Sequence, residues 1–186
     1  MMFHGLAVVS ADFFLAQHKN HLASEWASAE DFRHLQEALD KAHGCVMGRV
    51  THDLHPNIKK RRRIVLTRSI AAECITNHHT LFINPLEHDK TDFLEKIGNH
   101  SGGDRLCILG GADIYRFWLE NHGYTGFDLT IEHNIMFGTG IALFQCREGN
   151  ATDPRDAFGS CGMSLASTRP LNDRGTVLYR LGQPLP

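Results

Sequence analysis

The chain has 186 residues, of which 42% are hydrophobic and 22% charged, and its formal net charge is −2. This length suits a single domain, residues 1–186, that buries most of its apolar surface without disulfides or metals. The small net charge argues against nucleic-acid binding by the chain as a whole. No run of apolar residues is long enough to cross a bilayer. We therefore expect no nucleic-acid and no membrane partner.

The chain contains 5 cysteines and 13 histidines. The cysteines are widely spaced and form no Cys-x-x-Cys pair, so we expect reduced thiols in a cytoplasmic protein. Cys45 lies in an apolar run without a local histidine to activate it, which indicates a structural thiol rather than a nucleophile. No histidine spacing completes a zinc pattern, and we expect no metal site.

The N-terminal third predicts a strand, an irregular stretch and a helix. Residues 3–9 read as a strand, and residues 10–27 lack a regular pattern. Ser28 is a good helix N-cap followed by two acids, and Phe32, Leu35, Ala38 and Leu39 recur at helical spacing. We expect Gly44 to end that helix.

In the rest of the chain, predicted strands alternate with predicted helices. Such alternation predicts an α/β fold with a mostly parallel central sheet and helices on both faces. The polar, glycine-rich stretch 149–162 is expected to be a loop. The remaining predicted elements are strands at 45–47, 64–66, 81–83, 105–109, 127–131 and 176–181, and helices at 51–54, 91–97 and 112–120.

Two predicted strands end in glycine and open towards a helix, at Gly48 and at Gly110-Gly111. Glycine lets the backbone approach a phosphate closely, and the N–H groups of the following helix can bind it. A third strand end, Thr67-Arg68-Ser69, adds two hydroxyls and a guanidinium. Each turn alone is more typical of tight packing, and the absence of G-x-G-x-x-G disfavours an ordinary Rossmann site.

A basic run at residues 59–63 has two interpretations. It is either a nucleic-acid or targeting patch, or a solvated loop that raises the potential near an anionic ligand. The near-neutral net charge of the chain favours the second interpretation.

Taken in order, these motifs resemble the dihydrofolate reductase-like family. The branch most similar is typified by the C-terminal reductase domain of the riboflavin-pathway deaminase–reductase. The matching pieces include Val-Met-Gly-Arg-Val-Thr at 46–51 and Gly-Gly-Ala-Asp-Ile-Tyr at 110–115. The others lie at residues 10–12, 24–26, 30–31, 63–69, 129–131 and 138–144.

The resemblance implies NADPH as the cofactor. It implies that Arg49 and Arg68, with Thr67 or Ser69, bind the adenosine 2′-phosphate. The implied pyrophosphate site comprises Thr51 and the turns at Gly48, Gly110, Gly111, Ala112 and Asp113.

The resemblance also implies a substrate-binding carboxylate early in the first helix. Asp31 fits this role better than Glu30 by spacing, although acids there also offset the helix dipole. Thr130 is expected to hydrogen-bond this carboxylate, and Asp12 is a second candidate catalytic residue. Trp26 either lines the substrate pocket or staples a loop to the helix.

The implied function is NADPH-dependent reduction of a small pteridine- or pyrimidine-like heterocycle. The implied reaction is of the kind that dihydrofolate reductase or 5-amino-6-(5-phosphoribosylamino)uracil reductase catalyses. The alternative is a catalytically inactive nucleotide-binding module of the same fold. The resemblance further suggests a homodimer, with residues 138–144 contributing.

The opening loop departs from the family pattern, because Phe13 replaces a glycine that can take positive φ. Either the loop is rebuilt, or Phe13 and Phe14 fill part of the pocket, or one ring caps the core. Arg33 is the one arginine near the position expected for ribosyl-phosphate binding.

Overall fold

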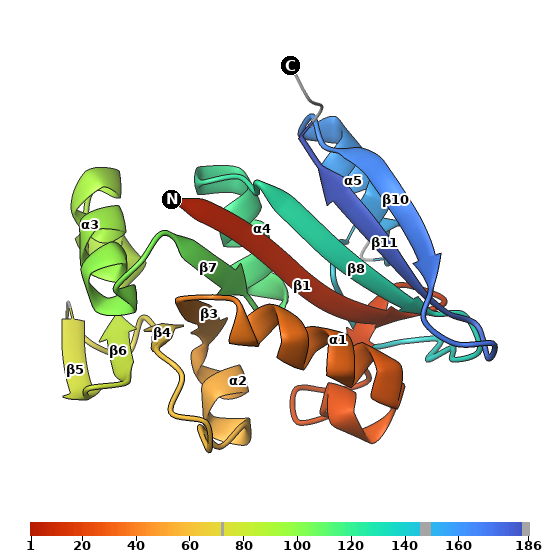
Figure 1. The fold of residues 1–186 in the computed structure, drawn as a ribbon, viewed down its shortest axis with the longest axis horizontal. Helices are drawn as coiled ribbons and strands as arrows, with labels where there is room; N and C mark the ends of the chain where they lie inside the picture. The colour runs from red at the N-terminus through yellow and green to blue at the C-terminus, as the bar shows by residue number, and fades with distance from the viewer. Residues whose placement is uncertain (72, 146–149, 184–186) are drawn as a thin grey trace.

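The computed structural model describes residues 1–71, 73–145 and 150–183, with the backbone alone for 73–77. Within these ranges, nine strands form one twisted sheet in the order β10-β11-β8-β1-β7-β3-β4-β6-β5 (Figure 1). The strands of this sheet are β1 Met2–Ser10, β3 Gly44–Gly48, β4 Arg63–Leu66, β5 Glu73–Asn77, β6 Thr80–Ile83, β7 Arg105–Ile108, β8 Gly126–Glu132, β10 Ser164–Pro170 and β11 Thr176–Gly182.

The six central strands, from β8 to β6, run parallel. The outer strands β5, β10 and β11 are antiparallel to their neighbours. A separate two-stranded ribbon joins β2 (Phe14–Ala16) to β9 (Ile141–Ala142). The parallel centre brings the carboxyl ends of six strands to one edge of the sheet, where ligands of open α/β sheets bind.

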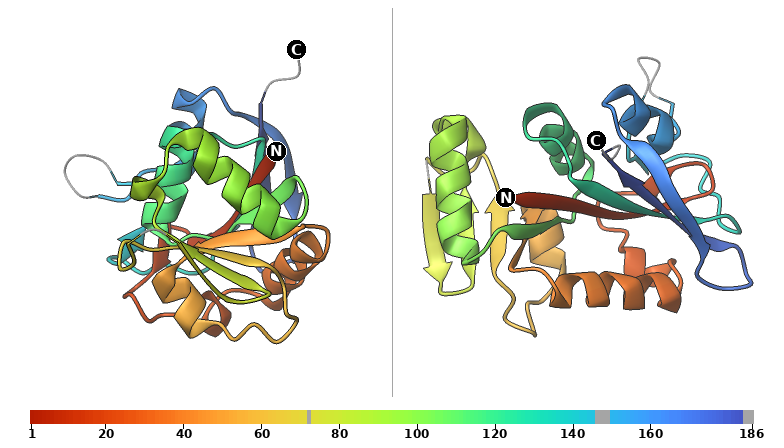
Figure 2. Two further views of the ribbon diagram at one scale, coloured as in Figure 1. Left: turned by 90° about the vertical axis from the view of Figure 1, so that its left-hand side faces the viewer. Right: turned by 45° about the horizontal axis from the view of Figure 1, so that its top comes forward.

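Helices cover both faces of the sheet. Figure 2 (right) shows α1 and α2 below it and α3, α4 and α5 above it. Leu39 of α1 shares a cluster with Leu6 and Val65, whereas Phe93 of α3 and Trp118 of α4 pack into the larger cluster. The predicted α/β architecture is confirmed. The helices are α1 Ala29–Asp40, α2 Arg49–Leu54, α3 Lys90–Ser101, α4 Ala112–Asn121 and α5 Pro154–Ser160, with short 3₁₀ turns at Ala23–Glu25 and Pro85–Glu87.

The start of α1 follows the predicted signal, because the Ser28 hydroxyl accepts a hydrogen bond from the backbone N–H of Asp31 at 3.2 Å. Two details of the prediction are wrong. The helix ends at Asp40, and Gly44 is already the first residue of β3. Phe32 is 52% exposed and does not belong to the buried face of the helix.

The predicted loop at 149–162 is also wrong, since it contains α5. Asp153 caps this helix by accepting from the Arg155 N–H at 2.9 Å, and Pro154 occupies the first turn. Phe158 is fully buried against the main core and holds the helix to the sheet. Asp-Pro is a sound helix start, but the surrounding glycines hid it in the sequence. Strands β2, β5, β9 and β10 were not predicted either.

None of the helices in the described part of the chain combines the length and the apolar character that a bilayer span requires.

Candidate functional site

The two predicted glycine turns lie side by side at the carboxyl ends of β3 and β7. The Gly48 N–H donates to the Gly110 carbonyl at 2.8 Å, and the Leu109 N–H donates to the Val46 carbonyl at 2.9 Å. Gly110 has φ +85°, and a Cβ placed on it would lie 2.3 Å from the ring of Tyr115. Only glycine both takes this positive φ readily and has no Cβ to collide with the ring. The Gly110–Gly111 peptide bond is cis.

Gly111 begins α4 and leaves room beside it. A Cβ on Gly111 would meet no atom within 4 Å, and no described side chain caps the helix start. The backbone N–H groups of a first turn, here including those of Ala112 and Asp113, have no partner within their own helix and are suited to bind an anion. The Asp113 carboxylate pairs with Arg116 at 2.6 Å on the surface. This arrangement fits the pyrophosphate of a dinucleotide.

The third strand end forms a compact hydroxyl pair. The hydroxyl oxygens of Thr67 and Ser69 lie 2.7 Å apart, and the Thr67 N–H donates to the carbonyl of Ile83 at 3.0 Å. Arg68, between them, is exposed. The hydroxyls and this guanidinium lie at the strand end where the sequence predicts a 2′-phosphate.

Arg49 is engaged elsewhere. Its Nε lies 3.0 Å from Asp53 Oδ2, and its guanidinium lies 5.4 Å from the centre of the Phe82 ring. If the guanidinium turns towards a phosphate beside Arg68, it gives up at most this contact through Nε. An exposed ion pair one helical turn apart contributes only about 0.3–0.5 kcal/mol, so that exchange costs little. Thr51 lies on the same helix, and its carbonyl accepts from His55 Nδ1 at 2.9 Å.

On the substrate side, the structure distinguishes the two acids of α1. Asp31 is 8% exposed, and the buried hydroxyl of Thr130, as a hydrogen-bond donor, lowers the pKa of its carboxyl group. Glu30 instead accepts from the Asn172 amide at 3.1 Å and lies 3.5 Å from Arg174. Of the two acids, Asp31 is therefore the buried one, and its role as the site carboxylate stays a prediction.

Burial and the nearby charge of Glu132 raise the pKa of Asp31 to about 6, against the lowering effect of Thr130 and of His34. A carboxyl group with a pKa near neutrality is able to hold or release a proton during a reaction.

Asp12 holds a turn together. Its Oδ1 accepts from the Ser10 hydroxyl at 2.6 Å and from the Phe137 N–H at 3.1 Å, and its Oδ2 accepts from the Gly138 N–H at 2.7 Å. Burial disfavours its charge, but these hydrogen bonds lower the pKa of Asp12 overall. The contacts explain Asp12 as an anchor of the opening loop, and a role in proton transfer stays a prediction.

The opening loop keeps a left-handed residue at Phe13, whose φ is +69°. Its N–H donates to the Ser10 carbonyl at 2.9 Å, and its partly buried ring packs against the main core. Phe14 begins β2 and pairs with Ala142. The phenylalanine therefore adopts a conformation that normally favours glycine.

Trp26 lies against Phe137, with ring centres 5.0 Å apart and the rings edge to face. This contact joins the segment before α1 to the turn that Asp12 holds, and Trp26 also lines a cavity with Ser28 and Glu132.

One buried acid of this region was missed by the sequence analysis. Glu132 is 2% exposed, and its two carboxylate oxygens accept from the Ser28 N–H at 2.7 Å and from the Thr176 hydroxyl at 2.6 Å. Glu132 follows Thr130 by two residues on β8 and so shares its face of the sheet. The two-residue spacing from Thr130 along the predicted strand was the sequence signal that could have identified Glu132.

In the described ranges, no three histidine, cysteine or acidic side chains gather as a set of metal ligands.

Comparison with known proteins identifies the family. The family model for dihydrofolate reductase matches residues 15–135, which is more than half of the chain. No curated protein matches the chain significantly by sequence.

Three solved structures share the fold. A protein of Shewanella sp. PV-4, whose name assigns it to riboflavin biosynthesis, is 14% identical with a TM-score of 0.67, and 100% of each chain is covered. Dihydrofolate reductase of Enterococcus faecalis, solved with NADP(H) and RAB-propyl, is 14% identical with a TM-score of 0.65, covering 99% of this chain and 97% of that one. A pyrimidine reductase-like protein of Corynebacterium diphtheriae is 12% identical with a TM-score of 0.68, covering 97% and 91%. These likenesses show the shared fold, and the family match shows that the chain belongs to the dihydrofolate reductase family.

Proposed function

We propose that this protein is an NADPH-dependent reductase of a small nitrogen heterocycle, pteridine- or pyrimidine-like. The observation that carries the proposal is the buried carboxyl group of Asp31 on α1, beside Thr130 of β8, together with the open space at Gly111 before α4. A carboxylate with one hydroxyl partner and little exposure retains acceptor capacity for the N–H groups of a flat ring.

The residues at the strand ends fit NADPH. The open first turn of α4 at Gly111 suits the pyrophosphate, and Arg68 with the hydroxyls of Thr67 and Ser69 suits the 2′-phosphate. NADPH would supply the hydride, and the protein contributes binding and orientation. Its presence in the Enterococcus faecalis structure supports the same choice of cofactor here.

Asp31 performs two tasks in this proposal. Ionised, it accepts hydrogen bonds from an amidine- or guanidine-like edge and orients the ring. With a pKa of about 6, it also holds a proton in a substantial fraction of molecules near neutral pH. Thr130 fixes the carboxyl group from β8 and keeps it aligned.

The test is a fluorescence titration with NADPH, followed by turnover measured as the loss of NADPH absorbance. Dihydrofolate and the aminopyrimidine intermediate of the riboflavin pathway are the first two substrates to offer. We expect NADPH binding and turnover of one of them, with loss of turnover but not of NADPH binding in Asp31→Asn. Binding without turnover of either substrate would favour the inactive nucleotide-binding module, and absence of NADPH binding would reject both functions.

We also propose a cytoplasmic homodimer. The buried free thiols of Cys45 and Cys107 suit a reducing compartment. Sedimentation equilibrium of the purified chain measures the oligomeric state directly.

A further inference from the structure

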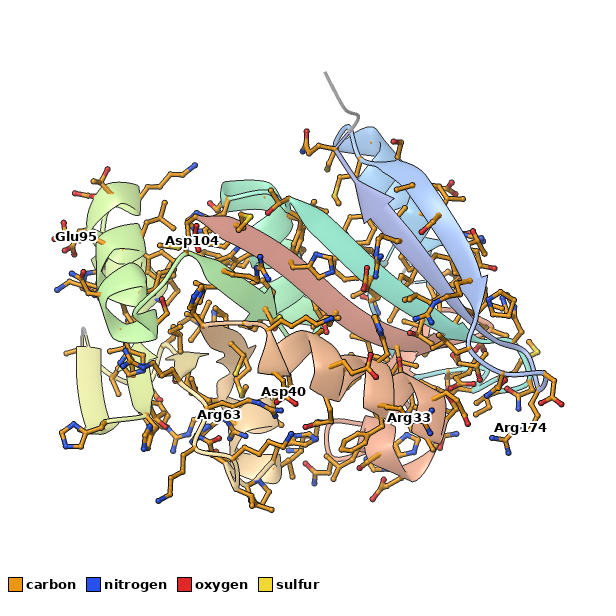
Figure 3. All side chains as sticks on the ribbon, in the orientation of Figure 1. Arg33, Asp40, Arg63, Glu95, Asp104 and Arg174 are labelled. Atoms are coloured by element: carbon orange, nitrogen blue, oxygen red, sulfur yellow. The ribbon has the colours of Figure 1, made fainter. Side chains whose placement is uncertain are left out.

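A cavity of about 570 Å³ lies beside α2, away from the glycine turns. Arg63 and Thr80 line it, and they are paired at the amino ends of β4 and β6. The glycine turns of the proposed cofactor site lie at the opposite, carboxyl ends of the strands. The cavity adjoins that site through Arg49, which contacts Asp53 and Phe82 of the lining. Figure 3 shows Arg63 beside α2. The lining residues are His52, Asp53, His55, Pro56, Asn57, Lys60, Arg63, His79, Thr80 and Phe82.

Arg63 is a buried cation without a carboxylate partner among the described residues. It is only 8% exposed. Its Nη1 donates to the His55 carbonyl at 2.6 Å and lies 3.3 Å from His52 Nδ1, and its Nη2 lies 3.4 Å from the Pro56 carbonyl. Its Nε has no hydrogen-bond partner. Neutral acceptors compensate a buried charge incompletely, and a charge in this position is normally paired.

A second cation, Lys60, adds to the positive charge of the cavity. Lys60 supplies an exposed ammonium group at its edge. The carboxylate of Asp53 also lines the cavity, but it already pairs with Arg49. A guanidinium has only donors, so His52 Nδ1 must accept and the ring carries its proton on Nε2. The lining therefore combines two cations with an N–H donor.

We propose that this cavity binds a small phosphate ester. The phosphate group compensates the charges of Arg63 and Lys60, and the organic part lies against Phe82 and Pro56. The volume is in the usual range for small-molecule pockets, roughly 300–1,000 Å³, and leaves room for more than a phosphate group alone. This inference does not depend on the reductase proposal.

Phenyl phosphate and inorganic phosphate are the probes, with dissociation constants measured by calorimetry on the full chain. We expect both to saturate, and phenyl phosphate to bind more tightly because its ring meets the apolar wall. Lys60→Asn should weaken phenyl phosphate roughly two- to fivefold, the range for an exposed charge. Asparagine tolerates the left-handed backbone at this position, where φ is +51°.

Lys59→Asn is the matched control, because Lys59 pairs with Asp40 of α1 and does not line the cavity. Arg63→Met should weaken binding by roughly tenfold or more, with folding checked by circular dichroism. If Arg63→Met does not fold, the comparison of Lys60→Asn with Lys59→Asn decides alone.

Three results would overturn the proposal. One is the absence of saturable phenyl phosphate binding. Another is an equal effect of the two lysine variants. The third is loss of binding in Arg68→Ala with no change in Lys60→Asn, because this would place the anion at the strand ends.

Discussion

Replacing Asp31 by asparagine should stabilise the folded protein at alkaline pH. The pKa of Asp31 is raised from 3.8 to about 6, chiefly because the carboxyl group is buried. A carboxyl group whose folded pKa lies above its unfolded pKa destabilises the fold when it is ionised. This loss of stability begins as the pH rises through the pKa of Asp31 in the unfolded chain, and it is complete above the pKa of Asp31 in the folded protein. Asparagine has a similar shape, keeps an oxygen that accepts from the Thr130 hydroxyl and carries no charge.

The magnitude follows from the two pKa values. One pKa unit corresponds to about 1.4 kcal/mol, so the full penalty is about 3 kcal/mol. The linkage relation places nearly all of it at about pH 8 and less than about 1 kcal/mol of it at about pH 4. Asp31→Asn should therefore exceed the parent protein in unfolding free energy by about 3 kcal/mol at the higher pH.

Urea unfolding of the parent and the variant at both pH values measures this difference. Asp12→Asn is the control with the opposite sign, because hydrogen bonds lower the pKa of Asp12. That variant should lose stability at about pH 8 and lose less in acid. A stability difference between Asp31→Asn and the parent that does not change with pH would refute the reasoning.

Three further predictions concern the cofactor turns and a buried carboxylate. Arg68→Ala should weaken NADPH by roughly 10- to 100-fold and leave NADH unchanged in fluorescence titrations; an equal loss for both cofactors would contradict the 2′-phosphate assignment. Gly110→Ala should lower the melting temperature strongly, since its Cβ would lie 2.3 Å from the Tyr115 ring, whereas Gly111→Ala should melt normally and bind NADPH weakly. The Asp128 carboxylate of β8 is 3% exposed and lies 2.8 Å from His34, 2.9 Å from Arg180 and 3.2 Å from His4. Asp128→Asn should cost about 2 kcal/mol in urea unfolding, less than for a fully buried ion pair because Arg180 is half exposed.

The elements that could be predicted carry their signal within a few residues. Ser28 and the acids after it mark the start of α1, and the glycine turns mark the ends of β3 and β7. Asp31 was favoured over Glu30 by its spacing from later motifs, and the structure supports that choice with burial and a bond to Thr130. Such features can be recognised in the sequence because they depend on hydrogen bonds between neighbouring residues or on the backbone freedom of glycine.

Other features depend on partners distant in the chain. The basic run at 59–63 was interpreted as a solvated loop, yet Arg63 is buried beneath α2, while Lys59 and Arg61 pair with Asp40. Nothing near these residues in the sequence distinguishes the buried arginine from its exposed neighbours. Its side chain faces inward only because β4 places it on the face that α2 covers.

The sequence by itself determined the α/β alternation and the glycine turns at two strand ends, whereas phosphate binding at those turns and the role of the α1 carboxylate stay predictions. The tertiary structure alone decided that Gly48 and Gly110 meet through a hydrogen bond and that Phe13 takes a left-handed conformation. It also decided that Glu132 holds the start of α1 from β8. The physical reason is that backbone capping and glycine conformation are local properties. Burial and charge pairing depend instead on which segments the folded sheet brings together.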